Sequence, residues 1–178
     1  MIIQSEFIQA CLTPSDINEH LPTLYDLAKK CTSVTELGVR DGVSTRAFLF
    51  SGVKFRSYDL YLDPTVKSLF DTVRQKLGTD VEYLIGNSLE ISIDLTDLLF
   101  IDTKHTYQQL SQELERHYKQ VRRFIVLHDM ESFGRQSEDG TRPGLIRAVE
   151  EFVEQHRNWK IKSKFKNNNG LWILESHG

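Results

Sequence analysis

Residues 36–45 read ELGVRDGVST, and this stretch decides the fold class. It begins in the strand candidate at residues 33–37 and extends into the helical pattern that starts at Val43. Gly38 and Gly42 let the backbone turn sharply and approach a bound ligand, and the N-terminus of the following helix adds free N–H groups. The pattern is E-x-G-x-x-x-G-x-S instead of G-x-G-x-x-G, and its leading acid suits a cationic ligand better than a pyrophosphate. A tight strand-to-helix turn without a ligand is the alternative at this point.

Short apolar runs alternate with helical patterns on both sides of this loop. Each run has the length of a strand, and each helical pattern repeats its apolar residues every three or four positions. This alternation predicts a parallel sheet with helices on both faces. The expected strands are residues 33–37, 54–59, 81–85, 98–101 and 124–127. The expected helices are residues 17–28, 43–50, 64–77, 106–121 and 143–156.

The segment from Trp159 onward changes character. Trp159, Ile161 and Phe165 alternate with lysines, which is the pattern of a strand whose exposed face protects a sheet edge. Residues 167–170 read NNNG, and Asn and Gly accept positive φ in hairpin turns. Residues 171–174 are apolar without alternation, as in a strand buried on both faces. We therefore expect an antiparallel hairpin with its second strand inside the sheet and its first strand at the edge.

Polar residues just after the predicted strands are the candidates for a site, because ligands of such sheets bind beyond the carboxyl ends of the strands. Asp59 ends the second strand, and a carboxylate there can accept hydrogen bonds from both hydroxyls of an adenosine ribose. A helix cap or a solvated loop residue is its alternative role. Asp102, His105, His128 and Asp129 follow the fourth and fifth strands, and we expect these four side chains to converge on one cleft.

Three motifs carry a resemblance to a known family: GVRDGVSTRAFL at residues 38–49, IDTKHTY at residues 101–107 and LHD at residues 127–129. With the reversed hairpin, they make the chain similar to class I S-adenosylmethionine (SAM)-dependent methyltransferases, and within these to a small branch resembling sugar and small-molecule O-methyltransferases. The resemblance extends from Asp16 to Glu175. It implies a single Rossmann-like α/β domain over residues 1–178. Its sheet is expected to be seven-stranded and mostly parallel with a reversed C-terminal strand.

The resemblance also assigns residues to the cofactor. It places the methionine part of SAM in the first loop, the ribose on Asp59 and the adenine beside the turn after the third strand. Relatives often have Gly-Asp-Ser in that turn, whereas this chain has Asn87 before Ser88, which keeps a hydrogen-bonding side chain but removes a charge. The residues expected to contact SAM are Glu36, Gly38, Arg40, Gly42, Ser44, Thr45, Asp59, Asn87 and Ser88.

Catalysis is expected at the ends of the fourth and fifth strands. Methyl transfer is an in-line displacement, and a hydroxyl acceptor must lose its proton with the help of a base or a metal ion. Asp102, His105 and His128 are the candidate catalytic residues, and Asp102 and Asp129 match the metal carboxylates of related O-methyltransferases. Two routes stay open: Mg²⁺ or another divalent cation helps to remove the proton, or His105 or His128 receives it. The other histidines, at 20, 117, 156 and 177, receive no role.

One charged stripe is predicted to be a solvated helix face. Its residues are Glu113, Glu115, Arg116, Lys119, Arg122 and Arg123.

Composition excludes several classes of protein. The 178 residues include 22 Lys and Arg against 25 Asp and Glu, a net charge of −3, so we expect no nucleic-acid partner. Cys11 and Cys31 form no metal or redox motif, so reduced thiols are expected. There is neither a signal-peptide pattern nor an apolar run long enough to span a bilayer. We therefore expect a cytoplasmic protein without a membrane partner.

The acceptor is expected to be a glycan or another small hydroxyl-bearing molecule. One chain of this size has no separate substrate domain, so the N-terminal segment, the loop at residues 130–142 or a partner subunit must grip it, and a homo-oligomer remains an option. A nicotinamide-dependent dehydrogenase is one alternative function, and the first loop and the hairpin argue against it. A non-catalytic SAM-binding module is the other, and only turnover distinguishes it from an enzyme.

Overall fold

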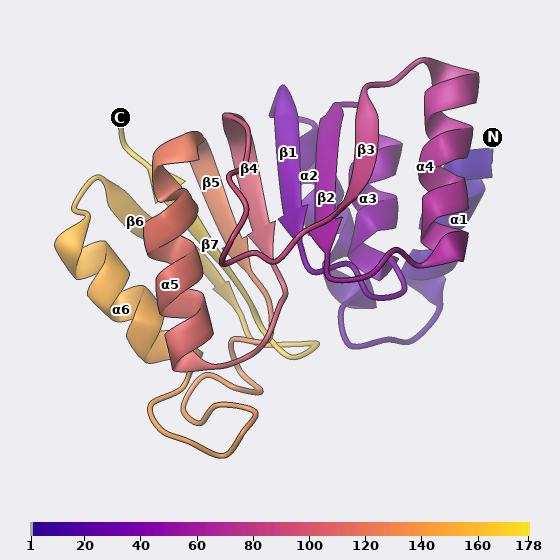
Figure 1. The fold of residues 1–178 in the computed structure, drawn as a ribbon. Coiled ribbons are helices and arrows are strands. Elements are labelled where there is room, and N and C mark those ends of the chain that lie inside the picture. The colour runs from indigo at the N-terminus through magenta and orange to yellow at the C-terminus, as the bar shows by residue number, and fades with distance from the viewer. Residues whose placement is uncertain (1) are drawn as a thin grey trace.

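The computed structural model describes residues 2–178, which form one seven-stranded sheet with helices on both faces (Figure 1). The strands lie in the order β3-β2-β1-β4-β5-β7-β6. Neighbours among β1 to β5 are parallel, whereas β7 runs antiparallel to both β5 and β6. This arrangement confirms the predicted fold class, including the reversed strand inside the sheet. The strands are β1 (Ser33–Leu37), β2 (Lys54–Asp59), β3 (Val81–Ile85), β4 (Thr96–Ile101), β5 (Val121–Leu127), β6 (Trp159–Phe165) and β7 (Leu171–Ser176).

The helices form two layers, one on each face of the sheet. α1 to α4 share one apolar core with the sheet, and α5 and α6 share the other. Strand β4 serves both cores, because successive side chains of a strand point to opposite faces: Leu98 and Phe100 enter the first, Leu99 and Ile101 the second. The helices are α1 (Ile2–Leu12), α2 (Leu21–Ala28), α3 (Val43–Ser51), α4 (Pro64–Leu77), α5 (Tyr107–His117) and α6 (Leu145–Gln155), with 3₁₀ turns at Asn18–His20 and Tyr118–Gln120.

The N-terminal part differs from the expectation. Helix α1 is not predicted by the apolar pattern, because its apolar residues form no single face and Ile8 and Leu12 remain exposed. The helix expected at residues 17–28 is divided: Ser15 Oγ accepts hydrogen bonds from the backbone ahead of a 3₁₀ turn, and α2 begins only at Leu21. Within residues 2–178, no helix is both long and apolar enough to cross a membrane.

The fold brings five loops to one edge of the sheet. Because β1 to β5 are parallel, their carboxyl ends all lie along the lower edge in Figure 1. The turn between β6 and β7 reaches the same edge, where Asn168 bonds to the segment that precedes α2. The residues predicted to bind a ligand therefore lie where parallel α/β sheets bind theirs.

Candidate functional site

The loop after β1 requires glycine at its first turn. Gly38 has a φ of 87°, and a Cβ there would lie 1.9 Å from the carbonyl oxygen of Asp102 at the end of β4. Gly42 has a φ of 73° and directly precedes α3, where a Cβ would lie 2.7 Å from a methyl group of Val66. The loop can therefore pack against the end of β4 only because it carries no side chain at Gly38.

Glu36 is a buried anchor for this loop. Its carboxylate accepts hydrogen bonds from Ser44 Oγ at 2.6 Å, Thr45 Oγ1 at 2.8 Å and Ser57 Oγ at 2.5 Å. Burial raises the pKa of Glu36 to about 7, although the three hydroxyls oppose the shift. Glu36 and Thr45 are fully buried, so their side chains tie β1, β2 and α3 together and fix the shape of the loop.

Asp59 also holds the loop in place. Its Oδ2 accepts hydrogen bonds from the backbone N–H groups of Val39 at 2.8 Å and Arg40 at 2.9 Å, and its Oδ1 accepts one from Leu60 at 2.6 Å. A carboxylate offers about four acceptor positions, so Asp59 keeps capacity for one more donor. The side chain of Arg40 turns outward and pairs with Asp16 at 2.7 Å.

Two cavities adjoin at this edge. The larger has a volume of about 380 Å³, within the range typical of small-molecule sites. The smaller, of about 120 Å³, shares Gly38, Arg40 and Asp102 with the larger and adds Ser44 and His105. Among the predicted residues, the larger cavity is lined by Gly38, Arg40, Asp59, Asn87, Ser88 and Asp102. The strand ends thus form two adjoining cavities that share residues after β1 and β4.

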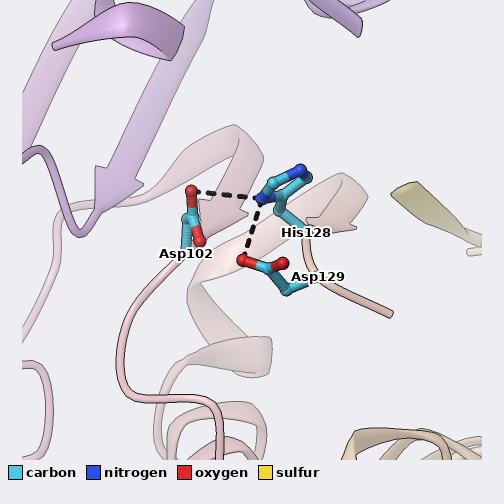
Figure 2. Close-up of side chains that lie close together, drawn as sticks. All are labelled: Asp102, His128 and Asp129. Atoms are coloured by element: carbon cyan, nitrogen blue, oxygen red, sulfur yellow. Dashed lines mark ion pairs between the residues drawn. The ribbon is translucent and has the colours of Figure 1, made fainter. Parts of the chain in front are cut away.

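A cluster of two carboxylates and a histidine lies at the ends of β4 and β5 (Figure 2). His128 Nδ1 is 3.4 Å from Asp102 Oδ2 and 3.2 Å from Asp129 Oδ2. Asp129 has a φ of 59°, which turns its side chain back toward Asp102 as the chain leaves β5. The structure therefore brings together three residues that the sequence predicted to converge.

The two ring nitrogens of His128 have different surroundings. Nε2 lies 3.1 Å from the carbonyl oxygen of Asp16 and 3.2 Å from that of Asn168, so this nitrogen carries a hydrogen. Nδ1 is buried and makes no well-formed hydrogen bond within the described residues 2–178. Burial lowers the pKa of His128, but Asp102 and Asp129 outweigh it and raise the pKa to about 10. The imidazole can thus face the carboxylates as a cation or, when neutral, with a free lone pair on Nδ1.

His105 is the fourth member of the cluster. Its Nε2 lies 3.1 Å from Asp102 Oδ1 and 3.0 Å from Asp129 Oδ2. Its Nδ1 lies 2.9 Å from Glu138 Oε2, and its ring stacks on Phe133 with centroids 4.8 Å apart. Burial lowers the pKa of His105, but the carboxylates raise it overall to about 10. The sequence did not single out Glu138, because it lies 33 residues away in the loop between β5 and α6.

The cluster fits a divalent cation. One potential ligand atom from each of Asp102, His128 and Asp129 lies within 4.8 Å of the others. Two carboxylate oxygens and one imidazole nitrogen form a donor set for a divalent ion, and the fixed Nε2–H of His128 is the arrangement usual for a metal-ligating histidine. Asp102 and Asp129 were predicted as metal ligands, whereas His128 was predicted only as a catalytic residue.

Side chains of α5 hold the turn after β3 by hydrogen bonds. Asn87 Oδ1 accepts a hydrogen bond from the backbone of Leu89 at 3.0 Å, and Ser88 Oγ donates one to Glu113 at 2.6 Å. Glu113 was expected on a solvated face of its helix, and this expectation is wrong: the residue is fully buried. The other five residues of that charged stripe are exposed, so only Glu113 lies on the inward side.

Comparison with known proteins identifies the fold. No family model and no curated protein sequence matches the chain. Among solved structures, the O-methyltransferase TomG from Streptomyces achromogenes, in complex with SAM, matches with a TM-score of 0.68 at 14% identity, covering 97% of this chain and 90% of that chain. The N-methyltransferase NodS from Bradyrhizobium japonicum, with S-adenosylhomocysteine (SAH), matches with a TM-score of 0.67 at 13% identity, covering 92% and 88%.

An O-methyltransferase from Bacillus cereus, in complex with SAH, matches with a TM-score of 0.65 at 14% identity, covering 99% of this chain and 91% of that chain. At sequence identities of 13–14%, these matches show a likeness in fold only. The chain therefore has the class I methyltransferase fold that its motifs resemble.

Proposed function

We propose that this chain, which has the class I methyltransferase fold, transfers the methyl group of SAM to a hydroxyl group of a small molecule. The observation that carries the proposal is the cluster of Asp102, His105, His128 and Asp129 beside the cavity at the ends of β1 to β4. A hydroxyl acceptor needs help to lose its proton, and this cluster combines groups that can move a proton with groups that can hold a cation.

The larger cavity supports SAM as the methyl donor. The loop at Gly38 has no side chain to obstruct an approaching ligand, and the N-terminus of α3 offers free N–H groups toward a carboxylate. Asp59 has one remaining acceptor position, which suits a ribose hydroxyl. Asp102 lines both cavities, so a donor in the larger cavity would point its reactive end toward the cluster.

The chain's own residues would prepare the acceptor for an in-line displacement. Asp102, His128 Nδ1 and Asp129 would hold a divalent cation, such as Mg²⁺ or another ion. When bound, it would lower the pKa of a hydroxyl and offset the charge that keeps His105 protonated. His105 lines the smaller cavity, and Glu138 and Phe133 fix its ring. Its Nε2 would receive the hydroxyl proton. The enclosed cluster would also exclude water from the reacting atoms.

The acceptor that best suits this site is a sugar or another small hydroxyl-bearing metabolite. The smaller cavity has a volume of only about 120 Å³, which suits a single hydroxyl group better than a bulky chain. The likeness to both O- and N-methyltransferases leaves the acceptor atom open, and the candidate cation ligands favour oxygen.

The proposal is tested by binding first and turnover second. Calorimetry on the full chain should show binding of SAH and none of NADH. Radiolabelled SAM should then transfer its label to members of a panel of sugars, phenols and aliphatic alcohols, and chelation followed by Mg²⁺ or Mn²⁺ should abolish and restore that transfer. Absence of SAH binding would contradict the proposal. SAH binding without turnover on any hydroxyl acceptor would favour a non-catalytic SAM-binding module.

A further inference from the structure

Three polar side chains form one stripe along α5 and hold the turn after β3. Gln109, Glu113 and His117 are spaced four residues apart, so they lie one above another on the same helix face. Gln109 and Glu113 both bond to Ser88 Oγ, and His117 Nε2 bonds to the carbonyl oxygen of Ser88 at 2.7 Å. Ser88 and Gln109 both line the larger cavity, so the stripe holds one wall of that cavity in place.

Glu113 is the centre of this network. Its Oε1 accepts hydrogen bonds from Ser88 Oγ at 2.6 Å, Thr103 Oγ1 at 2.7 Å and Gln109 Nε2 at 2.8 Å. Burial raises the pKa of Glu113, and these three donors oppose that shift by stabilising the carboxylate. A carboxylate only accepts hydrogen bonds, so the amide of Gln109 must turn its nitrogen toward Glu113.

This orientation decides which atom Gln109 offers to the cavity. Its two amide hydrogens are used by Glu113 at 2.8 Å and by Ser88 Oγ at 3.1 Å. Its carbonyl oxygen, Oε1, accepts no hydrogen bond within residues 2–178, although Gln109 lines the larger cavity. Both polar atoms of the Asn87 amide are used within its own turn, by Leu89 and Glu90. Gln109 Oε1 is thus the amide oxygen beside that turn that accepts no hydrogen bond within residues 2–178, whereas Asn87 Oδ1 already accepts one.

We infer that Gln109 Oε1 selects adenine by accepting a hydrogen bond from its exocyclic amino group, and that Glu113 is the residue that positions Gln109 for this contact. The inference rests on the proposed binding of SAM in the larger cavity. A free carbonyl oxygen favours a base with an amino group and disfavours hypoxanthine, which presents a carbonyl oxygen at the same position. A site built around a hydrogen bond discriminates more sharply than one built on shape alone.

The first experiment compares SAH with S-inosylhomocysteine, in which the amino group is replaced by a carbonyl oxygen. Calorimetry on the wild type should give at least about tenfold tighter binding of SAH, the equivalent of one lost hydrogen bond and one unpaired acceptor. Gln109→Leu should weaken SAH binding by about tenfold and leave the analogue nearly unchanged, so that the preference is lost. Gln108→Leu, which changes the exposed neighbouring residue, should behave as the wild type.

A second variant tests the positioning role of Glu113. Glu113→Gln replaces the carboxylate by an amide that can donate, so the Gln109 amide is free to turn over and present its nitrogen to the cavity. The preference for SAH over the inosine analogue should then fall at least about tenfold, an effect that a general loss of stability does not produce. A folded Glu113→Gln protein that keeps the wild-type preference would overturn the positioning role of Glu113. If Glu113→Gln fails to fold, Gln109→Leu still tests the contact with adenine.

The outcomes are distinguishable. A Gln109→Leu protein that keeps the wild-type preference would overturn the inference and leave the proposed function intact. A wild type that binds neither compound would overturn the proposed function, and this inference with it.

Discussion

At the scale of single residues, His128 is the feature that sets this site apart from an all-oxygen cation site. Two backbone carbonyls hold its Nε2–H, and its buried Nδ1 faces two carboxylates. Imidazole nitrogen is a ligand for ions such as Mn²⁺, Co²⁺ and Zn²⁺, whereas Mg²⁺ strongly prefers oxygen. The imidazole nitrogen of His128 therefore affects which cation the cluster would bind most tightly.

We predict that the full chain binds Mn²⁺ or Co²⁺ at least about tenfold more tightly than Mg²⁺. Calorimetry measures this affinity without any acceptor. His128→Asn should remove most of the difference, because an amide oxygen replaces the nitrogen. His156→Asn is the matched control, since His156 pairs with Glu115 outside the cluster. Equal affinities for the two kinds of ion in the wild type would contradict a nitrogen ligand.

Comparing substitutions at Gly38 and Gly52 distinguishes the cost of backbone strain from the cost of a steric clash. Both have positive φ, 87° and 76°, but a Cβ at Gly38 would meet the carbonyl of Asp102, whereas one at Gly52 would meet nothing within 4 Å. Gly52→Ala should cost about 1–2 kcal/mol of unfolding free energy from strain alone. Gly38→Ala should cost about 3–5 kcal/mol, because overpacking adds to the strain. Denaturant unfolding measures both, and equal losses would show that the loop can move away from β4.

At the scale of elements, the buried carboxyl group of Glu36 links β1, β2 and α3 by hydrogen bonds. Because this group titrates, it should make the free energy of unfolding depend on pH. The folded pKa of Glu36 is about 7, whereas glutamate in an unfolded chain titrates near 4.3. Between these values the folded state keeps a proton that the unfolded state has released. The stabilisation of the folded state by the extra proton on Glu36 is therefore fully present below pH 4.3. It is lost as the pH rises to about 7.

We predict that Glu36→Gln, which resembles the protonated acid, loses this dependence. Relative to the variant, the wild type should become less stable by about 3 kcal/mol between pH 4.3 and pH 7, most of it above pH 5. Denaturant unfolding at several pH values from 5 to 8 provides the comparison. Because His105 and His128 titrate in both proteins, only the difference between the two curves reports on Glu36. Parallel curves would contradict the prediction.

The elements also show how far the sequence predicts the structure. β1, β2 and β3 match their predicted bounds, because Gly38 follows β1, Asp59 ends β2 and Gly86 follows β3. β5 begins at Val121 instead of 124, since the apolar pattern stops at Arg122 and Arg123, whose charged groups lie on the surface. Helix α1 was not predicted. Few of its residues are buried, so its apolar residues do not recur at helical spacing.

The candidate site divides in the same way. Strand adjacency was enough to predict that Asp102, His105, His128 and Asp129 would converge. Glu138, which orients His105, was not predictable, because its place depends on how a long loop folds back. Glu113 was predicted as a surface charge. Its spacing of four residues from Gln109 and His117 is the signal that could have revealed a buried stripe.

At the scale of the whole molecule, the turn of the β6–β7 hairpin links distant parts of the chain at the site. The Asn168 side chain accepts a hydrogen bond from the backbone of Glu19 at 3.0 Å and donates one to the carbonyl of Ser15 at 2.7 Å. The carbonyl of Asn168 itself faces His128 Nε2. The hairpin turn therefore fixes the segment before α2 and the ring of His128 together.

We predict that Asn168→Gly loosens this connection at a cost of about 2 kcal/mol, from two lost hydrogen bonds of about 1 kcal/mol each. Glycine suits the positive φ of 46°, so strain does not contribute. Amide hydrogen exchange should accelerate at residues 17–20. Asn169→Gly is the control, because Asn169 also has positive φ but its side chain makes no hydrogen bond within residues 2–178. Equal effects of the two variants would contradict the proposed connection.

The position of β7 has a consequence for synthesis on the ribosome. β7 is translated after β6, yet it lies between β5 and β6, so the nascent chain carries an unpaired edge on β5 until β7 has emerged. Such an edge is a target for wrong pairing, and chaperones protect chains in this state. The residues that line the larger cavity lie between Gly38 and Gln109, whereas Asn168, whose carbonyl oxygen contacts His128 Nε2, is translated much later. The residues that line the cavity are therefore synthesised before the hairpin that holds the ring of His128.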